Sequence, residues 1–541
     1  MEIKQNLTVI TLDEDHNLSF YDSQTILEVL RSNNIKIVAP CGGNGICGKC
    51  LIKVIDGRVS PPLAEEKKIL GDERIREGYR LACRATLSEQ NSVTISLIKE
   101  EQVAQIVSTF NPFDDNFRIN FSSTANRTKD VSYKCGIDVG TTTIVVYLVK
   151  FSNNTFEVLG NISALNAQRP YGQDVISRIQ YTQENEKGLE VLQRVLVNQL
   201  NQMISTLLTD YNVNHKELKE VVVVGNPTIT HLFLKAPVVQ IALAPYKLYY
   251  EKEQRRSAKE LSFKNLDGET TFIVPGNISA YVGSDITVGM YSVEINKKEE
   301  NVLFLDIGTN GEIALFANGN LYSCSAAAGP AFEGASITFG MGAIKGAIDH
   351  VWITEEENQK KVNYSVIGES EAKGICGSAI IDTVSIMLEL EQIDETGAMD
   401  EQNGFISDYN NSKAFKICDK IYFTNGDVRE VQLAKAAIAA GVEILLKEAG
   451  IDTFQLDKVI LAGGFGSYIK IESAQRIGLL PNIDSKKIVS LGNCAGRGAL
   501  LSLLGEEHLK KIDNLRKESK YIELSSLPAF QQRFVDAMIF D

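Results

Sequence analysis

The chain has 541 residues, of which 44% are hydrophobic and 23% are charged, and its net charge is −14 at pH 7. A chain of this length predicts several domains with cores of their own, and its acidic balance argues against a nucleic-acid partner, because phosphate binding requires a basic surface. No apolar run approaches the roughly 20 residues of a membrane-spanning helix and the N-terminus does not have the pattern of a secretory signal, so we expect a cytoplasmic protein without a membrane partner.

Residues 1–98 are predicted to form a β-grasp domain. The predicted strands are NLTVITL, NLSF, IKIVAP, LIKVID and SVTISLI, which are short apolar runs separated by polar turns. SQTILEVLRSNN places apolar side chains at near-helical spacing after Ser23, the predicted N-cap, and EEKKIL can form one further helical turn. Five short strands and a helix in so short a segment are typical of the β-grasp fold.

A glycine-rich loop, CGGNGICGKC at residues 41–50, carries three of the nine cysteines of the chain. An odd number of cysteines argues against a disulfide framework and favours a metal or cluster site. With Cys83, the spacing is C-x5-C-x2-C followed by a distant cysteine. The first gap is one residue longer than in plant-type [2Fe–2S] ferredoxins, and in this it resembles the adrenodoxin-like and putidaredoxin-like ferredoxins. Glycine lets such a loop adopt positive φ and direct N–H groups at sulfur.

A [2Fe–2S] cluster is the favoured occupant of this loop. Structural zinc sites usually use two paired knuckles, whereas this chain has one C-x2-C pair and two separate cysteines. Zinc and unligated thiols remain as less favoured alternatives. The predicted cluster ligands are Cys41, Cys47, Cys50 and Cys83.

Residues 99–131 are predicted to be a linker, because the segment is polar, contains the small-residue run SSTANRT and lacks clean periodicity. Its four phenylalanines leave a small packed subdomain as the alternative. A mobile connector would let the cluster move between an electron donor and an acceptor.

Two segments repeat the pattern of an apolar strand, a turn and a second apolar strand: KCGIDVGTTTIVVYLV from residue 134 and VLFLDIGTNGEIALF from residue 302. One Asp-x-Gly-Thr turn is a weak signal, but two copies with matching strands indicate an internal duplication. Glycine lets the backbone approach phosphate and threonine adds donors. A carboxylate at each strand end, Asp138 and Asp306, can hold Mg²⁺ directly or through water. The predicted phosphate-binding residues are Gly140, Thr141, Thr142, Thr143, Gly308, Thr309, Asn310 and Gly311.

A third turn, in KVILAGGFGSYI from residue 458, is suited to the nucleoside half of a nucleotide. The predicted contacts are Gly463, Gly464, Phe465 and Gly466. The three signals together resemble the phosphate-1, phosphate-2 and adenosine motifs of the acetate and sugar kinase/Hsp70/actin superfamily. The resemblance implies an ATPase domain at 132–541 with two ribonuclease-H-like lobes, 132–300 and 301–541. It also implies that Asp138 and Asp306 are catalytic and position Mg²⁺ and the attacking water.

Two helices are expected to connect these lobes. NCAGRGALLSLL, residues 493–504, resembles the second connecting helix because of its small residues, and GQDVISRIQYTQ is the candidate for the first. Asp174 in the latter segment either faces the cleft or begins the helix.

The motifs CGGNGICGKC, GIDVGTTT, LDIGTNGE, AAAGPAFEG, GICGSAIID and LAGGFGSY follow one another along the chain. Over essentially its full length, this set resembles the ATP-dependent reductive activators of corrinoid proteins. The resemblance implies a multidomain α+β and α/β fold: a [2Fe–2S] ferredoxin-like domain, a linker and the two-lobed ATPase. It implies a [2Fe–2S] cluster, ATP and Mg²⁺ as cofactors. The implied reaction passes one electron to the Co(II) of a corrinoid protein and regenerates Co(I) for methyl transfer.

The implied partners are the corrinoid protein and an upstream low-potential electron donor, and a homodimer is suggested by the resemblance alone. Ser323 or Ser325, in YSCSAAAGPAFEG, is a candidate contact for the corrinoid, with a helix cap as the alternative. Some relatives carry an additional middle domain, for which residues 99–131 leave little room.

Three other functions remain open at this point. An ATP-driven activator of a radical dehydratase or an aryl-CoA reductase would resemble the C-terminal half, but such proteins usually bridge one [4Fe–4S] cluster across a dimer. A redox-regulated small-molecule kinase would need a base for substrate phosphorylation. A redox sensor with an ATP clamp would reduce nothing. The joint motif set favours the corrinoid activator.

Overall fold

The computed structural model describes most of the chain. The described residues are 5–10, 15–21, 23–33, 35, 37, 45, 50–87, 92–97, 131–152, 155–297, 299–356, 359–368, 370–400, 404–410, 412–466 and 468–540. Nearly all of the predicted linker and most of the predicted strand at 35–40 therefore lie outside the described residues. Contacts divide the chain into two units, 1–102 with 166–195 and 103–165 with 196–541.

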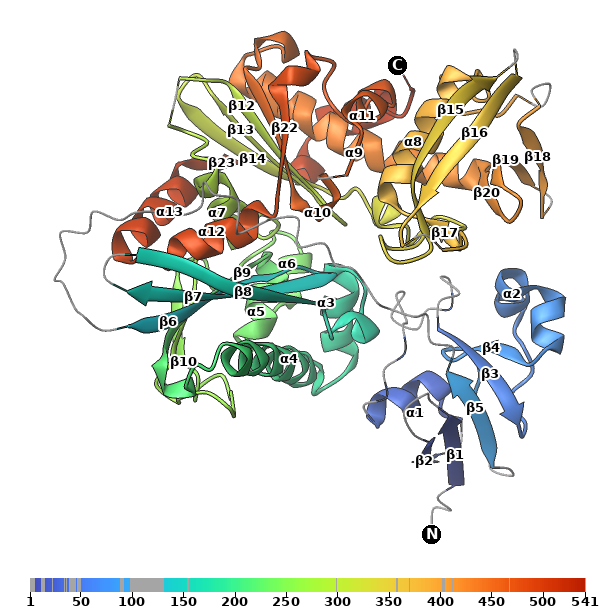
Figure 1. The fold of residues 1–541 in the computed structure, drawn as a ribbon, viewed down its shortest axis with the longest axis horizontal. Coiled ribbons are helices and arrows are strands. Elements are labelled where there is room, and N and C mark those ends of the chain that lie inside the picture. Colours follow the sequence, from blue (N-terminus) through green and yellow to red (C-terminus); the bar gives the residue numbers. More distant parts are fainter. Residues whose placement is uncertain are drawn as a thin grey trace. The chain divides into compact units, whose positions relative to one another are not determined.

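A five-stranded sheet in the order β2–β1–β5–β3–β4 forms the N-terminal domain (Figure 1). Its strands are β1 (Gln5–Ile10), β2 (Asp15–Phe20), β3 (Leu51–Asp56), β4 (Tyr79–Leu81) and β5 (Val93–Leu97). β1 lies antiparallel to β2 and parallel to β5, and β3 lies antiparallel to both β4 and β5. This mixed pairing, with the first and last strands parallel, confirms the predicted β-grasp domain.

Helix α1 (Ile26–Ser32) buries its apolar side chains in the core of this domain. It begins after Thr25, whose hydroxyl accepts a hydrogen bond from the N–H of Glu28, while the Glu28 carboxylate accepts one from the N–H of Thr25. This reciprocal capping box fixes the helix start, so the prediction of Ser23 as N-cap was wrong by two residues. Helix α2 (Ala64–Arg76) is longer than the single turn that we predicted.

Two six-stranded sheets lie in the segment that we predicted as the ATPase domain and share one arrangement, which confirms the predicted duplication. In each sheet a three-stranded antiparallel meander lies beside strands that run parallel to its first member. The first sheet, in the order β10–β11–β9–β6–β7–β8, consists of β6 (Ser132–Val139), β7 (Thr143–Ser152), β8 (Thr155–Leu165), β9 (Leu218–Gly225), β10 (Gln254–Ser257) and β11 (Thr271–Val274). The second, in the order β22–β21–β12–β13–β14–β23, consists of β12 (Val302–Ile307), β13 (Gly311–Ala317), β14 (Asn320–Ala326), β21 (Lys458–Ala462), β22 (Ile488–Gly492) and β23 (Ser519–Tyr521). The predicted phosphate hairpins are the β6–β7 and β12–β13 turns.

Two smaller sheets lie between β14 and α9 in the sequence and are shown in yellow and orange in Figure 1. Their strands are β15 (Ala347–Glu356), β16 (Gln359–Val366), β17 (Gly374–Ile375), β18 (Ile406–Tyr409), β19 (Ser412–Cys418) and β20 (Ile421–Thr424). The remaining helices are α3 (Val175–Glu184), α4 (Gly188–Asp210), α5 (Pro227–Phe233), α6 (Val239–Ala242), α7 (Ser284–Ser292), α8 (Gly377–Glu389), α9 (Asn425–Ala449), α10 (Gly463–Gly466), α11 (Ile471–Arg476), α12 (Cys494–Ser502), α13 (Glu506–Glu518) and α14 (Pro528–Asp536).

Helix α7 packs against α12. We had predicted GQDVISRIQYTQ as the first connecting helix, the partner of α12. A Cβ at Gly498 of α12 would collide with the carbonyl oxygen of Val288 on α7, so the two backbones lie in direct contact. The predicted first connecting helix instead forms α3, and Asp174 caps it by accepting a hydrogen bond from Ser177 N at 2.8 Å. The alternative reading of Asp174, a residue that begins a helix, is therefore the one that the structure supports.

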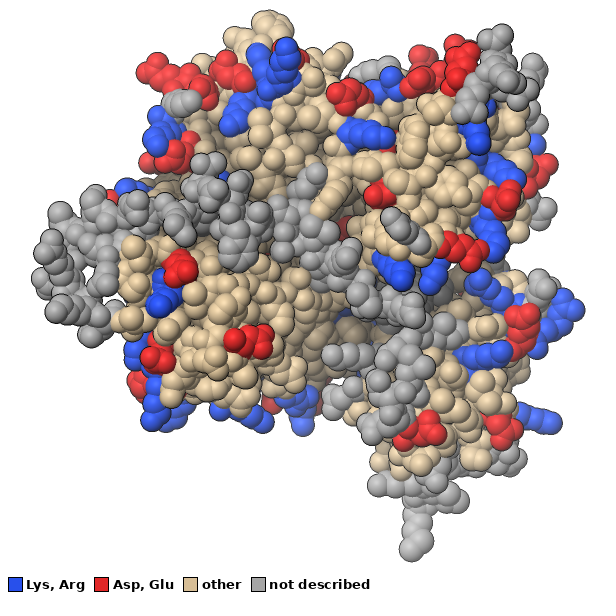
Figure 2. Space-filling view, viewed as in Figure 1, with Lys and Arg blue, Asp and Glu red and all other residues tan. Residues whose placement is uncertain are grey.

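Within the described residues no helix has both the length and the apolar character needed to cross a membrane. On the face shown in Figure 2, lysine and arginine side chains are interspersed with aspartate and glutamate. The described part of that face therefore has no extended basic patch of the kind that binds a phosphate backbone.

Candidate functional site

Two of the four predicted cluster ligands are among the described residues, and their thiols converge. Cys50 Sγ lies 3.3 Å from Cys83 Sγ, and both residues are buried. Cys50 directly precedes β3 and Cys83 follows β4, so the pairing of these two strands brings the thiols together. Cys41 and Cys47 lie outside the described residues. Converging thiols are the donors that an iron–sulfur cluster requires, so the described pair fits the predicted group.

A buried ion pair holds the strand that leads to Cys83. Arg80 on β4 donates from Nε and Nη2 to the two carboxylate oxygens of Glu66, each at 2.9 Å. The backbone N–H of Leu81 also donates to Glu66, at 2.7 Å. The Arg80 side chain is 6% exposed and the Glu66 side chain 0%. The bidentate geometry and the third hydrogen bond compensate both charges for the loss of water.

The strands β6 and β12 place Asp138 and Asp306 at corresponding positions, each beside its hairpin turn. Each turn is closed by a backbone hydrogen bond: Gly140 N donates to the carbonyl of Thr143 at 2.8 Å, and Gly308 N donates to that of Asn310 at 2.9 Å. The second strands begin at Thr143 and Gly311. The predicted phosphate residues therefore occupy two equivalent turns, as the duplication requires.

Four carboxyl groups gather around these strand ends. They belong to Asp138, Asp285 on α7, Asp306 and Glu312 on β13. Burial is the largest cause of a raised pKa in all four groups. The pKa rises to about 7 for Asp138, to about 8 for Asp285 and to about 6 for Asp306, and it lies well above its ordinary value for Glu312. Repulsion among the group adds to the pKa of every member except Asp306. All four residues remain partly exposed, so a ligand can reach them.

This group fits a cation that is shared with phosphate. Within the described parts of the chain, no set of three carboxylate, histidine or cysteine side chains is positioned to hold a metal ion without other ligands. Mg²⁺ is commonly held by one or two carboxylates together with nucleotide phosphates and waters. A divalent cation would also offset the repulsion that raises these pKa values.

Two helix-capping asparagines direct amide donors into the site. Asn493 caps α12 by accepting from Gly496 N at 2.6 Å, and its Nδ2 donates to Oδ2 of Asp138 at 2.9 Å. Asn226 caps α5 in the same manner, and its Nδ2 donates to Oγ1 of Thr141 at 3.0 Å. Each follows a strand that ends in glycine, β9 for Asn226 and β22 for Asn493. Sequence analysis missed these residues, although this repeated Gly-Asn step was a signal for them.

Glu333 lies between the two hairpins. It ends the short helical turn Ala331–Glu333 in the AAAGPAFEG segment. Its Oε2 accepts a hydrogen bond from Thr142 Oγ1 at 3.1 Å, and its Oε1 accepts one from Thr309 Oγ1 at 2.7 Å. One carboxylate therefore connects a threonine of each predicted phosphate turn. The motif drew attention to the segment, but neither Glu333 nor the carboxylates Asp285 and Glu312 were predicted.

The predicted nucleoside turn approaches the same carboxylates. Gly463 has φ of +81°, and a Cβ there would lie 2.5 Å from Oδ1 of Asp306. Glycine is therefore required by both backbone conformation and space. Gly464, Phe465 and Gly466 form the rest of α10. The Phe465 ring stacks on Phe332, with centroids 5.3 Å apart and planes at 21°, and its contact with a nucleoside remains a prediction.

The candidate serines do not lie at a helix start. Both are in strand β14. Ser323 is fully buried and its hydroxyl accepts a hydrogen bond from Ser519 at 2.8 Å. Its proposed contact with a corrinoid was therefore wrong for this conformation, because the side chain faces the protein interior. The same contact for Ser325 remains a prediction.

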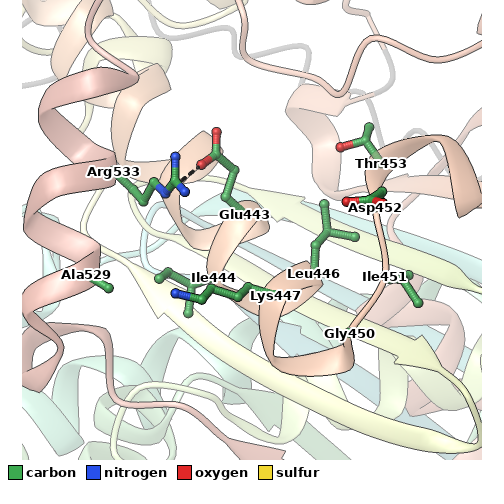
Figure 3. Close-up of a pocket in the computed structure, with 10 residues that line it drawn as sticks. All are labelled: Glu443, Ile444, Leu446, Lys447, Gly450, Ile451, Asp452, Thr453, Ala529 and Arg533. Carbon is green, nitrogen blue, oxygen red and sulfur yellow. Dashed lines mark ion pairs between the residues drawn. The ribbon is translucent and has the colours of Figure 1, made fainter.

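An open hollow of about 410 Å³ lies elsewhere, beside the end of α9 (Figure 3). The charged residues that line it include Glu443, Lys447 and Arg533, and Arg533 pairs with Glu443 at 3.4 Å. None of its lining residues comes from the hairpins, α7 or the nucleoside turn. The hollow is therefore separate from the candidate site. The candidate site is identified by the side chains of the hairpins, α7 and the nucleoside turn.

Models of three protein families match consecutive parts of the chain. Residues 10–88 match the 2Fe-2S iron-sulfur cluster binding domain, residues 133–298 match the RACo middle region, and residues 300–541 match the C-terminal ASKHA domain of RACo. The middle region lies within the segment that we predicted as the first lobe. We expected little room for a middle domain because we looked for it in residues 99–131, whereas the middle region matches residues 133–298.

Two relatives each match more than two thirds of the chain. The corrinoid activation enzyme RamQ of Eubacterium limosum is 34% identical over an alignment of 445 residues, and the match covers 78% of this chain and 72% of RamQ. The [Co(II) methylated amine-specific corrinoid protein] reductase of Methanosarcina barkeri is 26% identical over an alignment of 412 residues, and the match covers 71% of this chain and 72% of the reductase. The solved structure of a reductive activator for corrinoid,iron-sulfur protein has a TM-score of 0.68 and 29% identity, and the match covers 99% of this chain and 98% of that one.

Proposed function

The chain belongs to the RACo-type reductive activators of corrinoid proteins, and we propose from this premise that it uses ATP to drive one electron onto the cobalt of a corrinoid protein. Co(II) is the substrate and Co(I), the form that accepts methyl groups, is the product. The observation that carries the proposal is that one chain combines a converging thiol pair with two equivalent hairpins, each of which has a carboxylate at its strand end. The same chain is 34% identical to a corrinoid activation enzyme.

The N-terminal domain would handle the electron. When bound, the [2Fe–2S] cluster supplies a one-electron carrier that Cys41, Cys47, Cys50 and Cys83 would hold. The buried pair of Arg80 and Glu66 keeps the approach to Cys83 in place. Because burial and hydrogen bonds to sulfur tune the potential of such clusters, this rigid surrounding would help to set the potential of the donor.

The ATPase domain would hold Mg²⁺-ATP between its hairpins. Hydroxyls and N–H groups of the two turns would bind the phosphates, and the Gly463–Gly466 turn would receive the nucleoside. Asp138 and Asp306 would share the cation with the phosphates and position the attacking water. Asn493 holds Asp138 in one orientation through its amide donor.

ATP is needed because the electron moves against a potential difference. A one-electron step that is uphill by about 120 mV is disfavoured about a hundredfold, since a factor of ten corresponds to about 59 mV. We propose that ATP binding offsets this in one of two ways: the ATPase domain adopts a form that binds only the Co(II) partner, or the bound complex changes the axial ligand of the cobalt. Hydrolysis would then reset the protein.

Two of the three named relatives indicate the class of partner. One reduces a methylated amine-specific corrinoid protein and another activates a corrinoid iron–sulfur protein, by their names. We propose a corrinoid protein of a methyl-transfer system as partner, with a low-potential donor upstream. A homodimer and a cytoplasmic location remain predictions.

Anaerobic visible spectroscopy tests the proposal. Each of several Co(II) corrinoid proteins, including methylated amine-specific and corrinoid iron–sulfur types, is mixed with the chain, excess strong reductant and Mg²⁺-ATP. At least one should develop the Co(I) band only when ATP is present. If none responds, while ATP is consumed in proportion to a phosphorylated small molecule, the kinase alternative is supported instead.

A further inference from the structure

Glu333 connects two hydroxyl groups that the proposed function assigns to phosphate. Thr142 belongs to the first hairpin and Thr309 to the second, and both donate to the one carboxylate, at 3.1 and 2.7 Å. A threonine hydroxyl has a single hydrogen to donate. In this arrangement Glu333 therefore accepts the proton of each hydroxyl.

Phosphate oxygens and Glu333 are acceptors of the same kind. Both are negatively charged and neither can donate a hydrogen to the other. A phosphate group that accepts from Thr142 and Thr309 must therefore replace Glu333 as their partner. The two negative groups also repel one another at the short distances set by the turns, where Gly308 lies beside Oε1 of Glu333.

We propose that Glu333 competes with the phosphates of ATP for Thr142 and Thr309, so that ATP binding breaks a link between the two hairpins. This inference rests on the proposed binding of ATP at the hairpins. Glu333 thereby weakens nucleotide binding and makes the hairpins respond to it. Its role is one of positioning, because it acts through the two threonines.

The backbone around Glu333 is firmly held, so its side chain is the part that must move. Phe332 is 2% exposed and stacks on Phe465. On the other side, Thr338 donates from its N–H and its hydroxyl to Oδ1 of buried Asp427, at 2.7 and 2.9 Å. Replacement of Glu333 should therefore leave the surrounding fold in place.

Binding of Mg²⁺-ATP, Mg²⁺-ADP and adenosine to the full chain and to Glu333→Gln tests the proposal by calorimetry. The amide removes the negative charge and can donate to phosphate, so we expect Mg²⁺-ATP to bind at least about tenfold more tightly, or about 1.4 kcal/mol. Adenosine has no phosphate, so its affinity should be the same in both proteins. Glu371→Gln is the matched control, because Glu371 is exposed and pairs with Lys420.

A second comparison isolates the threonine link. In a Thr309→Val background one of the two competing hydrogen bonds is absent, so the gain from Glu333→Gln should be smaller than in the wild-type background. Equal gains in the two backgrounds would contradict the proposal. If Glu333→Gln does not fold, Glu333→Asp keeps the charge but is too short to reach both hydroxyls, and a tighter affinity for Mg²⁺-ATP is again required.

Failure of this inference differs from failure of the proposed function. If the wild-type chain binds Mg²⁺-ATP and Glu333→Gln binds it equally or more weakly, the competition is refuted while the ATPase assignment stands. If the wild-type chain binds adenine nucleotides no better than adenosine, the ATP site itself is refuted, and the inference with it.

Discussion

Asn493 donates from Nδ2 to Oδ2 of Asp138 at 2.9 Å, across 355 residues of sequence. Its Oδ1 accepts from Gly496 N, so the amide cannot rotate without losing the cap of α12. The same side chain thus begins a helix and orients a carboxylate of the candidate ATP site.

Asn493→Asp should separate these two roles. Aspartate is also a good N-cap, but it places a second negative charge beside Asp138 and removes the donor. Because the donor that orients Asp138 is lost while the helix cap is kept, we expect kcat/KM for Mg²⁺-ATP hydrolysis to fall at least about tenfold, with the fold intact by circular dichroism. Asn214→Asp, at the exposed cap before His215–Glu217, is the matched control. Hydrolysis at the wild-type rate in Asn493→Asp would contradict the assigned role.

Gly463→Ala should destabilise the protein. A Cβ at this position meets Oδ1 of Asp306 at 2.5 Å, and its φ of +81° strains any residue with a side chain. Left-handed strain costs about 1–3 kcal/mol, so the denaturant midpoint should fall by a corresponding amount. Gly464→Ala serves as the stability control, because a Cβ there meets no atom within 4 Å. Equal midpoints for the two variants would show that the Asp306 contact is not formed.

The carboxylate group predicts a pH effect on stability. Burial raises the pKa of Asp285 from 3.8 to about 8, so between about pH 4 and pH 8 the folded protein holds a proton that the unfolded chain releases. The free energy of unfolding should therefore fall as pH rises through this window. Asp285→Asn removes this ionisation and should raise the melting temperature at pH 8, measured without nucleotide. Its advantage should shrink towards pH 4; a constant advantage at both pH values would argue against this origin.

The ion pair of Glu66 and Arg80 is expected to be essential to the N-terminal domain. Glu66→Gln leaves the charge of Arg80 buried without its partner, and breaking a buried pair in this way costs about 3–5 kcal/mol. We expect that domain to unfold at lower denaturant concentration and to take up less cluster, measured by visible absorption per chain. Glu77→Gln, an exposed change nearby, should alter neither quantity. A fully loaded Glu66→Gln protein of normal stability would show that the pair contributes little.

Local patterns predicted the parts of the site that lie at strand ends. Asp138 and Asp306 were found because each ends an apolar strand before a glycine-threonine turn, and the duplication reinforced both. Glu333 could not be found in this way, because its partner Thr142 is 191 residues away and only the packing of the meanders brings them together.

Two errors have different physical causes. The N-cap of α1 was within reach of the sequence, since Thr25 is followed by Glu28 at capping-box spacing. The first connecting helix was not, because the contact of α7 with α12 depends on the close approach of Gly498 to Val288. The small residues of 493–504 marked one of the two helices, but tertiary packing decides which helix packs against it.

A single-turnover experiment tests the central claim most directly. The chain is reduced, freed of excess reductant and mixed anaerobically with a Co(II) corrinoid protein that responds in the catalytic assay, with or without Mg²⁺-ATP. We predict that Co(I) forms only with ATP, at no more than one cobalt per cluster, and in step with the return of the oxidised cluster spectrum. Cys83→Ala and Asp306→Asn should each abolish it, whereas Cys418→Ala, on strand β19, should not. Co(I) formation to the same extent without ATP would contradict the account.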